Sequence, residues 1–300
     1  MTSRVLVLGA GGFLGRHVRH ALDAGGAETV GTGRSARPGV DHVIDLAAAT
    51  QHELDKLITA IDPTAVVNCA GATYGTVTDL TQGNVVAVHA LLSSLSWSAP
   101  TARLVQLGSA AEYGGAPHGT SQAEDYEPRP GGAYGYTKLA GTTMVLRARS
   151  QGFDAVVLRA FNVSGPGSPP STLLGRTLSQ LRVGSEVRLG PLDTWRDFVD
   201  VRDVAAAVAL ALDVPDLPPL LNVGRGQAVL ARSVVDQLVA ASGTGATVVE
   251  EDAEHASHAG SPAATVPWQQ ADLTTVTSHL GWSPSIDLET SIHDTWLAIQ

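Results

Sequence analysis

A glycine-rich turn placed directly behind a short apolar segment constrains the fold of this chain more than any other feature. Residues 5–8 (VLVL) are typical of a fully buried strand, and residues 13–24 have the length and periodicity of a helix. At such a junction, glycines permit a tight turn, and the free N–H groups of the helix amino terminus bind a pyrophosphate. An ordinary loop turn is the alternative. We predict a dinucleotide site made by Gly9, Gly12, Phe13, Leu14 and Gly15.

Short apolar strands alternate with longer helices through the first half of the chain. We expect further strands at 28–32, 43–45, 65–68, 103–107 and 155–159, with helices at 52–61, 83–96 and 134–150. This alternation predicts right-handed βαβ units and an α/β fold with a doubly wound parallel sheet, the Rossmann architecture.

The pattern changes after residue 162. A Pro/Gly loop at 165–170 precedes an expected helix and short strand within 171–195, and helix 201–213 and strand 220–223 are expected to return to the main sheet. Helix 231–241, strand 246–250 and helices 273–280 and 288–299 follow. We predict a dinucleotide-binding domain at 1–164, rejoined by 197–223, and a smaller carboxyl-terminal substrate-binding lobe at 165–196 and 224–300.

The composition limits the classes of partner. With 19 basic and 29 acidic residues the net charge is −10, which argues against a general nucleic-acid surface. No apolar run has the length of a membrane span, and the first apolar segment is too short for a signal peptide. The single cysteine, Cys69, excludes an internal disulfide and a cysteine-rich metal site. We expect a cytoplasmic protein without a metal, and we interpret His255 and His258 as solvated residues of a polar loop.

The end of the second expected strand indicates which dinucleotide binds. An acid there would bind the ribose 2′-hydroxyl and repel a 2′-phosphate, whereas an arginine favours the phosphate. Here Thr32 and Gly33 are followed by Arg34 and Ser35, with Arg37 nearby and no acid. We predict NADP(H) rather than NAD(H), with the general abundance of arginine in this chain as the alternative explanation.

Two later strand ends are expected to complete the cofactor site. Asp45 and Leu46 follow the third strand, where they are placed to contact the adenine edge, although a solvated loop acid is the alternative for Asp45. Ala70 and Gly71 follow the fourth strand, and their small size lets the backbone approach the cofactor ribose. Cys69 is interpreted as a packed side chain rather than a nucleophile, because no histidine lies close in sequence.

A tyrosine and a lysine four residues apart carry the predicted chemistry. Tyr134 and Lys138 share one face of the helix expected at 134–150, and a lysine charge lowers the pKa of a neighbouring phenol. Tyr136 lies on the wrong face. Only two basic residues in the chain are lysines, and a retained lysine is informative because arginine does not easily lose its proton. A surface Tyr–Lys pair is the alternative.

Ser109 lies just beyond the strand expected at 103–107. A hydroxyl at the carboxyl end of a parallel strand points into the cofactor crevice, where it can hydrogen-bond a substrate carbonyl. Without the tyrosine–lysine pair downstream, Ser109 would be interpreted as an ordinary turn serine.

Together these motifs resemble the extended short-chain dehydrogenase/reductase family, and the likeness covers essentially the whole chain. It continues through RAFNVSGPG at 159–167, RDFVDVRD at 196–203, NVG at 222–224 and LGWSP at 280–284. The resemblance implies a catalytic set of Ser109, Tyr134 and Lys138, supported by Asn84. It implies cofactor contacts from Leu107, Tyr134, Lys138, Phe161 and Val163, and a substrate site that includes Ser109, Ala110, Asn162 and Arg196. A homodimer through the helices at 84–96 and 134–150 is expected on the same ground.

Departures from the family pattern narrow the chemistry. Dehydratases of this family carry an Asp-Glu pair after the serine position, where this chain has Ala110 and Ala111, so we do not expect dehydration. The Ser-x-x-Glu-Tyr-Gly and Arg-Asp-Phe-Val-Asp-Val patterns resemble reductases of NDP-4-keto-6-deoxyhexoses. Segment 250–265, where such an enzyme would supply an arginine for the pyrophosphate, is acidic and free of arginine.

We therefore predict an NADPH-dependent ketoreductase acting on an NDP-4-keto-6-deoxysugar in secondary-metabolite or cell-surface sugar biosynthesis. The acidic segment keeps a non-nucleotide ketone, such as a polyketide or aromatic aglycone, open as an alternative. Two further alternatives are an NDP-sugar 4-epimerase with retained NAD and a non-catalytic NADP sensor. The intact set of Ser109, Tyr134 and Lys138 argues against the sensor.

Overall fold

A computed structural model describes residues 3–251 and 266–300. Its main element is a seven-stranded sheet in the order β10-β6-β5-β4-β1-β2-β3, and every neighbouring pair is parallel. The strand order reverses between β1 and β4, which is where doubly wound sheets bind dinucleotides. The strands are β1 (Arg4–Leu8), β2 (Glu28–Gly33), β3 (His42–Val43), β4 (Ala65–Asn68), β5 (Arg103–Ser109), β6 (Ala155–Ala160) and β10 (Leu220–Val223).

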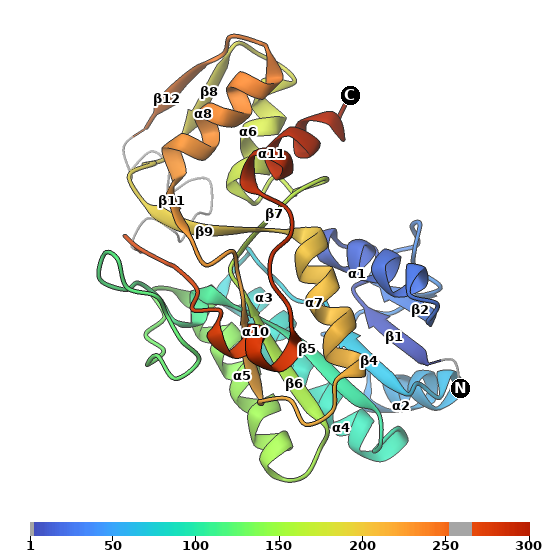
Figure 1. The fold of residues 1–300 in the computed structure, drawn as a ribbon. Helices are drawn as coiled ribbons and strands as arrows, with labels where there is room; N and C mark the ends of the chain where they lie inside the picture. Colours follow the sequence, from blue (N-terminus) through green and yellow to red (C-terminus); the bar gives the residue numbers. More distant parts are fainter. Residues whose placement is uncertain (1–2, 252–265) are drawn as a thin grey trace.

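Helices cover both faces of this sheet (Figure 1). One face packs against α1 (Phe13–Ala24) and α7 (Val201–Asp213), and the other against α2 (Gln51–Ile61), α4 (Ala87–Ser98) and α5 (Ala133–Ser150). Alternate residues of β1 enter the two cores, with Val5 and Val7 on the α1 side and Leu6 and Leu8 on the α2 side. The predicted α/β fold is confirmed.

Most of the elements in the second half of the chain form a smaller lobe, at the top of Figure 1. It holds a sheet of order β11-β9-β7, made by β7 (Asn162–Ser164), β9 (Trp195–Asp200) and β11 (Ala228–Leu230). A parallel pair joins β8 (Glu186–Leu189) to β12 (Thr247–Glu250). An apolar cluster is shared by α6 (Leu173–Leu181), α8 (Ala231–Ser242) and α11 (Leu288–Leu297).

The segment before α11 is fixed to the main sheet rather than to the lobe. Apolar side chains of α10 (Thr274–Leu280) and Trp282 join the core on the α7 side. The Trp282 indole donates to the Asp203 carbonyl at 3.1 Å, and the Asp203 carboxylate accepts from the Ser285 hydroxyl at 2.7 Å and from Ile286 N at 3.0 Å. The return of β10 to the main sheet is as predicted, and the division into two domains stays a prediction.

Several expected boundaries were wrong. The third strand, expected at 43–45, is His42–Val43, because the Asp45 side chain accepts from Ala47 N and starts a turn. The helix expected at 83–96 begins earlier, with α3 (Val77–Thr81) and its capping box of Thr76 and Asp79. A π-helical turn at Gln82–Val86 then joins it to α4. The strand expected at 103–107 extends to Ser109.

No helix in residues 3–251 and 266–300 is long and apolar enough to cross a membrane. Segment 252–265, with His255 and His258 and most of the acidic arginine-free stretch, lies outside the described residues.

Candidate active site

The glycine turn has the shape that a dinucleotide requires. Gly9 has φ +74°, and a Cβ there would lie 2.8 Å from Ala70 N. A Cβ on Gly15 would overlap the Gly9 carbonyl oxygen, so both positions need glycine. Gly12 begins α1 without a side-chain cap among the described residues. Uncapped N–H groups and the positive end of a helix dipole suit a pyrophosphate, so the residues present fit the cofactor.

The loop after β2 places arginines beside this turn. Arg34 and Ser35 are exposed there, so their side chains are accessible to a ligand that enters from solvent. The stem of Arg37 lies over Gly11, where a Cβ would come 2.5 Å from Arg37 Cδ. The Arg37 side chain therefore lies beside the glycine turn.

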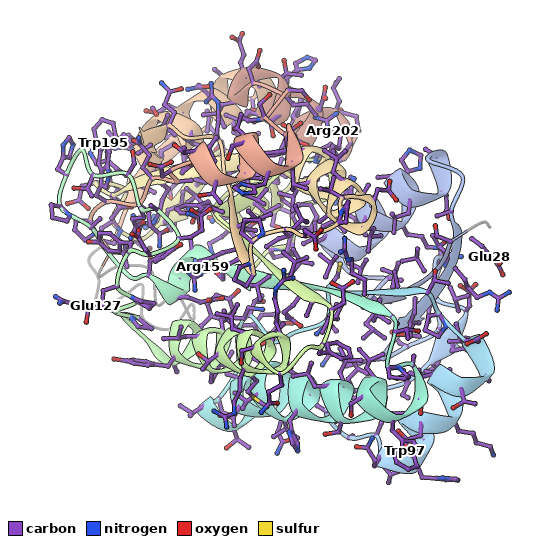
Figure 2. The ribbon with its side chains drawn as sticks, turned by 60° about the horizontal axis from the view of Figure 1, so that its bottom comes forward. Glu28, Trp97, Glu127, Arg159, Trp195 and Arg202 are labelled. Carbon is purple, nitrogen blue, oxygen red and sulfur yellow. The ribbon has the colours of Figure 1, made fainter. Side chains whose placement is uncertain are left out.

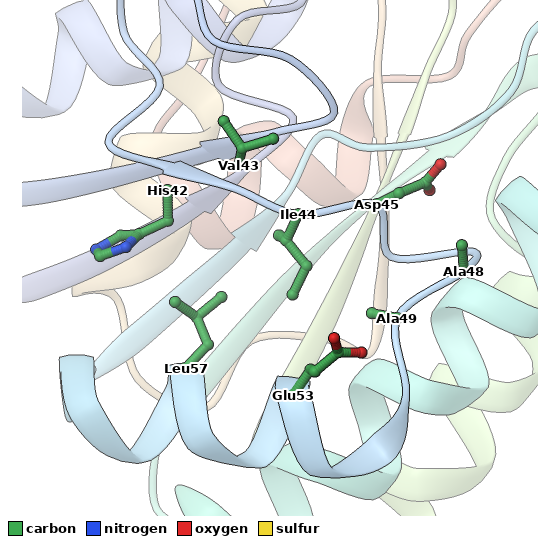
Figure 3. A pocket seen from close by; sticks show the side chains of 8 residues that line it. All are labelled: His42, Val43, Ile44, Asp45, Ala48, Ala49, Glu53 and Leu57. Atoms are coloured by element: carbon green, nitrogen blue, oxygen red, sulfur yellow. The ribbon is translucent and has the colours of Figure 1, made fainter.

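Asp45 and Leu46 lie beyond the edge strand β3. Asp45 lines an open cavity of about 470 Å³ between β3 and α2, together with His42, Ile44 and Leu57. In Figure 3 the Ile44 side chain points toward Leu57, whereas the Asp45 carboxylate points away from it. Leu46 is buried in the core on the α2 side. The adenine contact stays a prediction.

The structure brings the three predicted catalytic side chains to the carboxyl end of β5. Ser109 is the last residue of β5, and Tyr134 and Lys138 lie on the first turns of α5. The Ser109 hydroxyl lies close enough to the Tyr134 phenol to influence its pKa, and Lys138 Nζ donates to the Leu107 carbonyl at 2.6 Å. Leu107 and Ser109 are two residues apart on one strand, so the phenol and the ammonium lie at the same strand end.

Burial, rather than the lysine charge, dominates the titration of this pair. Burial raises the pKa of Tyr134, and the neighbouring Ser109 hydroxyl opposes that rise only in part. Burial lowers the pKa of Lys138, and the negative charge of Glu112 opposes this. The expectation of a lowered tyrosine pKa was wrong for this structure.

Asn84 connects α5 to the end of β4. It lies in the π-helical turn, where its Oδ1 accepts from Ala72 N at 3.0 Å. Its Nδ2 donates to Ala72 O at 2.8 Å and to Thr137 Oγ1 at 3.1 Å. Because Thr137 precedes Lys138, Asn84 helps to fix the helix that carries the lysine.

A buried ion pair that sequence reasoning missed supports the same residues. Glu112 and Arg159 are almost fully buried and join at 2.8 Å (Figure 2 shows Arg159 in the interior). Glu112 Oε1 also accepts from Ser109 N at 2.7 Å and from Thr142 Oγ1 on α5 at 3.0 Å. The Arg159 guanidinium stacks over the Tyr113 ring at 4.1 Å. The one feature of the sequence that pointed to this ion pair was the glutamate directly before Tyr113 and Gly114.

The predicted substrate residues come from both parts of the fold. Ala110 is buried in the turn after Ser109, and Asn162 starts β7. Arg196 on β9 is buried, and burial lowers its pKa to about 10. Phe161 packs against Tyr113 in a buried cluster, and Val163 packs on the core of the α1 side. The nicotinamide contacts of Phe161 and Val163 stay predictions.

Cys69 follows β4 beside Lys138. Burial raises the pKa of its thiol to about 12, and the lysine charge opposes this. A thiol with so high a pKa is a poor nucleophile at neutral pH, which agrees with a packing role.

The seven-stranded parallel sheet and the glycine turn at its first βα junction define a Rossmann-fold protein of the extended short-chain dehydrogenase/reductase class. Residues 5–224 match the model described as the NAD dependent epimerase/dehydratase family, and this chain belongs to that family.

Relatives of known activity act on sugar nucleotides. The dTDP-6-deoxy-L-talose 4-dehydrogenase (NAD(P)(+)) of Kitasatospora kifunensis is 38% identical over 99% of this chain and 95% of that protein. The GDP-6-deoxy-D-mannose reductase of Pseudomonas aeruginosa is 27% identical over 97% of this chain and 95% of its own length. Among solved structures, MoeE5 in complex with UDP-glucuronic acid and NAD is 28% identical, with a TM-score of 0.86 over 99% of this chain and 98% of that one.

Proposed function

We propose that this chain is an NADPH-dependent ketoreductase that reduces the keto group of an NDP-4-keto-6-deoxyhexose. The observation that carries the proposal is that Ser109 and the Tyr134 phenol lie together at the strand end to which Lys138 is bonded. The similarity to a dTDP-6-deoxyhexose 4-dehydrogenase supports position 4 of a deoxysugar.

Each side chain has a distinct role in this proposal. The Ser109 hydroxyl donates to the substrate carbonyl oxygen and orients it, and the Tyr134 Oη–H gives that oxygen its proton. A raised tyrosine pKa suits this direction, because the phenol stays protonated until the oxygen becomes basic. NADPH, when bound, supplies the hydride, and the glycine turn, Arg34 and Ser35 would hold it. Lys138 would bind its ribose.

The test is NADPH consumption with a panel of dTDP- and GDP-linked 4-keto-6-deoxyhexoses and aromatic ketones. Tyr134→Phe should abolish turnover while leaving NADPH affinity, measured by fluorescence, within about twofold. Tyr136→Phe is the matched control, because its side chain is 60% exposed two residues further along α5. Unchanged turnover in Tyr134→Phe would refute the assignment.

A non-nucleotide ketone is the second candidate, favoured by the acidic, arginine-free sequence at 250–265. Turnover of aromatic ketones without turnover of sugar nucleotides would select it. Tightly held NAD released on denaturation would instead indicate an epimerase.

We also propose a cytoplasmic homodimer formed through α4 and α5. Trp97 near the end of α4 and Tyr136 on α5 are 83% and 60% exposed, and Figure 2 shows Trp97 at the periphery. Large exposed aromatic side chains are typical of contact surfaces. Sedimentation of the wild type and of Trp97→Glu tests the assembly.

A further inference from the structure

The amide of Gln269 is held in one orientation by two backbone carbonyls. Gln269 is 4% exposed and lies beside β9, next to the bridge between Trp195 and Trp268. Its Nε2 donates to Ala110 O at 2.8 Å and to Gly114 O at 3.2 Å. Carbonyl oxygens can only accept hydrogen bonds. If the Gln269 amide were rotated by 180°, its Oε1 would face the carbonyl oxygens of Ala110 and Gly114 with no hydrogen between them. The amide therefore keeps Nε2 toward these carbonyls and Oε1 on the opposite side.

This orientation is passed to Asn162. The Asn162 Nδ2 donates to Asp197 O at 3.1 Å and faces Gln269 Oε1 at 3.5 Å. With both amide hydrogens directed to these oxygens, the Asn162 carbonyl oxygen is the atom left for a ligand. In residues 3–251 and 266–300 this oxygen accepts no hydrogen bond, and Asn162 is only half-buried.

The same glutamine connects the two sides of the proposed substrate site. Ala110 and Gly114 bound the turn that follows Ser109, and Asn162 begins β7. Gln269 therefore sets the position of the substrate-binding amide relative to the serine that orients the carbonyl.

We infer that Gln269 is a positioning residue for substrate specificity: together with Asp197 O it keeps both amide hydrogens of Asn162 engaged, so that Asn162 presents a hydrogen-bond acceptor and selects a substrate hydroxyl. The inference rests on the proposed function and on the sequence-based prediction that Asn162 contacts the substrate. A hydroxyl can donate to this oxygen, whereas a keto or ether oxygen at the same place would face it unpaired. The reacting carbonyl therefore lies at Ser109 and Tyr134, and a neighbouring hydroxyl of the sugar lies at Asn162.

The experiment compares a dTDP-4-keto-6-deoxyhexose with its 2- and 3-fluoro analogues, since fluorine cannot donate a hydrogen bond. In the wild type, one analogue should bind about three- to tenfold more weakly, with kcat changed much less than KM. In Gln269→Leu and in Asn162→Leu this discrimination should fall to within about twofold. Gln270→Leu is the matched control, because Gln270 bonds Ser121 and Ala228 N instead, and it should discriminate as the wild type does.

Affinity is measured by calorimetry with NADP⁺ present, and the melting temperature and NADP⁺ affinity of each variant report whether it is folded. If Gln269→Leu does not fold, Gln269→Met, which keeps the length of the side chain but lacks its amide, carries the test. A protein that binds the sugar nucleotide without reducing it would refute the proposed function and leave the inference standing. Equal affinity of the wild type for all analogues would overturn the inference, whatever the turnover. Full discrimination in Gln269→Leu would also overturn it. If the protein binds no sugar nucleotide, both the proposed function and the inference are wrong.

Discussion

Replacing Arg159 by methionine removes one partner of the buried ion pair and leaves the Glu112 carboxylate without the guanidinium that contacts it. Both side chains are almost fully excluded from water, at 2% and 0% exposure, so solvent does not screen the remaining charge. Removing one partner of such a pair costs about 3–5 kcal/mol in the free energy of unfolding. The stacking of Arg159 on Tyr113 adds about 1 kcal/mol to the loss. At about 2 °C per kcal/mol for a chain of this size, the melting temperature should fall by about 8 °C or more.

A double variant separates the cost of the unpaired Glu112 charge from the loss of the Arg159 side chain itself. Glu112→Gln combined with Arg159→Met removes the buried charge but keeps an oxygen that accepts from Ser109 N, so it should recover about 2 kcal/mol relative to Arg159→Met alone. Urea denaturation followed by circular dichroism measures all three proteins. Arg188→Met is the control, because its pair with Glu186 is about half-exposed and should contribute at most about 1 kcal/mol. The reasoning fails if Arg159→Met loses less than about 1 kcal/mol, or if the double variant is no more stable than Arg159→Met.

Two other predictions concern pH and the cofactor. Burial raises the pKa of Asp197 from 3.8 to about 6, so its contribution to stability is full at low pH and is lost as the pH rises through about 6. Relative to Asp197→Asn, the wild type should therefore gain unfolding free energy in urea titrations as the pH falls from about 7 to about 5, and parallel pH profiles would contradict this. Arg34→Ala should raise the KM for NADPH about tenfold or more and leave that for NADH unchanged, since only NADPH carries the 2′-phosphate. Equal changes in the KM for NADPH and for NADH, measured by steady-state kinetics, would show that Arg34 does not bind the 2′-phosphate.

The sequence was sufficient for features that depend on local pattern. The buried runs at 5–8 and 65–68 and the glycine turn predicted the sheet and the strand-to-helix junction, because backbone geometry there permits few residue types. The pairing of Tyr134 with Lys138 followed from helical spacing, the position of Ser109 from the rule that parallel strands end at one edge, and the set of three from the family resemblance.

Features that depend on distant partners were missed. The burial of Glu112 depends on its ion pair with Arg159, which is 47 residues later in the chain on β6, the strand beside β5. The orientation of Gln269 depends on its hydrogen bonds to carbonyls more than 150 residues earlier in the chain, which the sequence around Gln269 does not indicate. The pKa of Tyr134 moved in the unexpected direction because burial depends on the packing of the whole site, which helical spacing does not report.

The first turn of α7 is attached to both parts of the molecule at once. Asp200 caps it, Arg202 pairs with Asp200 and with Asp294 of α11 at 2.7 Å, and Asp203 holds Ser285. The turn therefore holds the carboxyl end of β9, in the lobe, against α7, which packs on the main sheet (Figure 1). The other end of β9 is held as well, because Trp195 N donates to Pro267 O at 2.9 Å and Gln269 N donates to Trp195 O at 3.1 Å. Arg196 thus lies on a strand that is fixed at both ends, which leaves it little room to shift when a ligand binds.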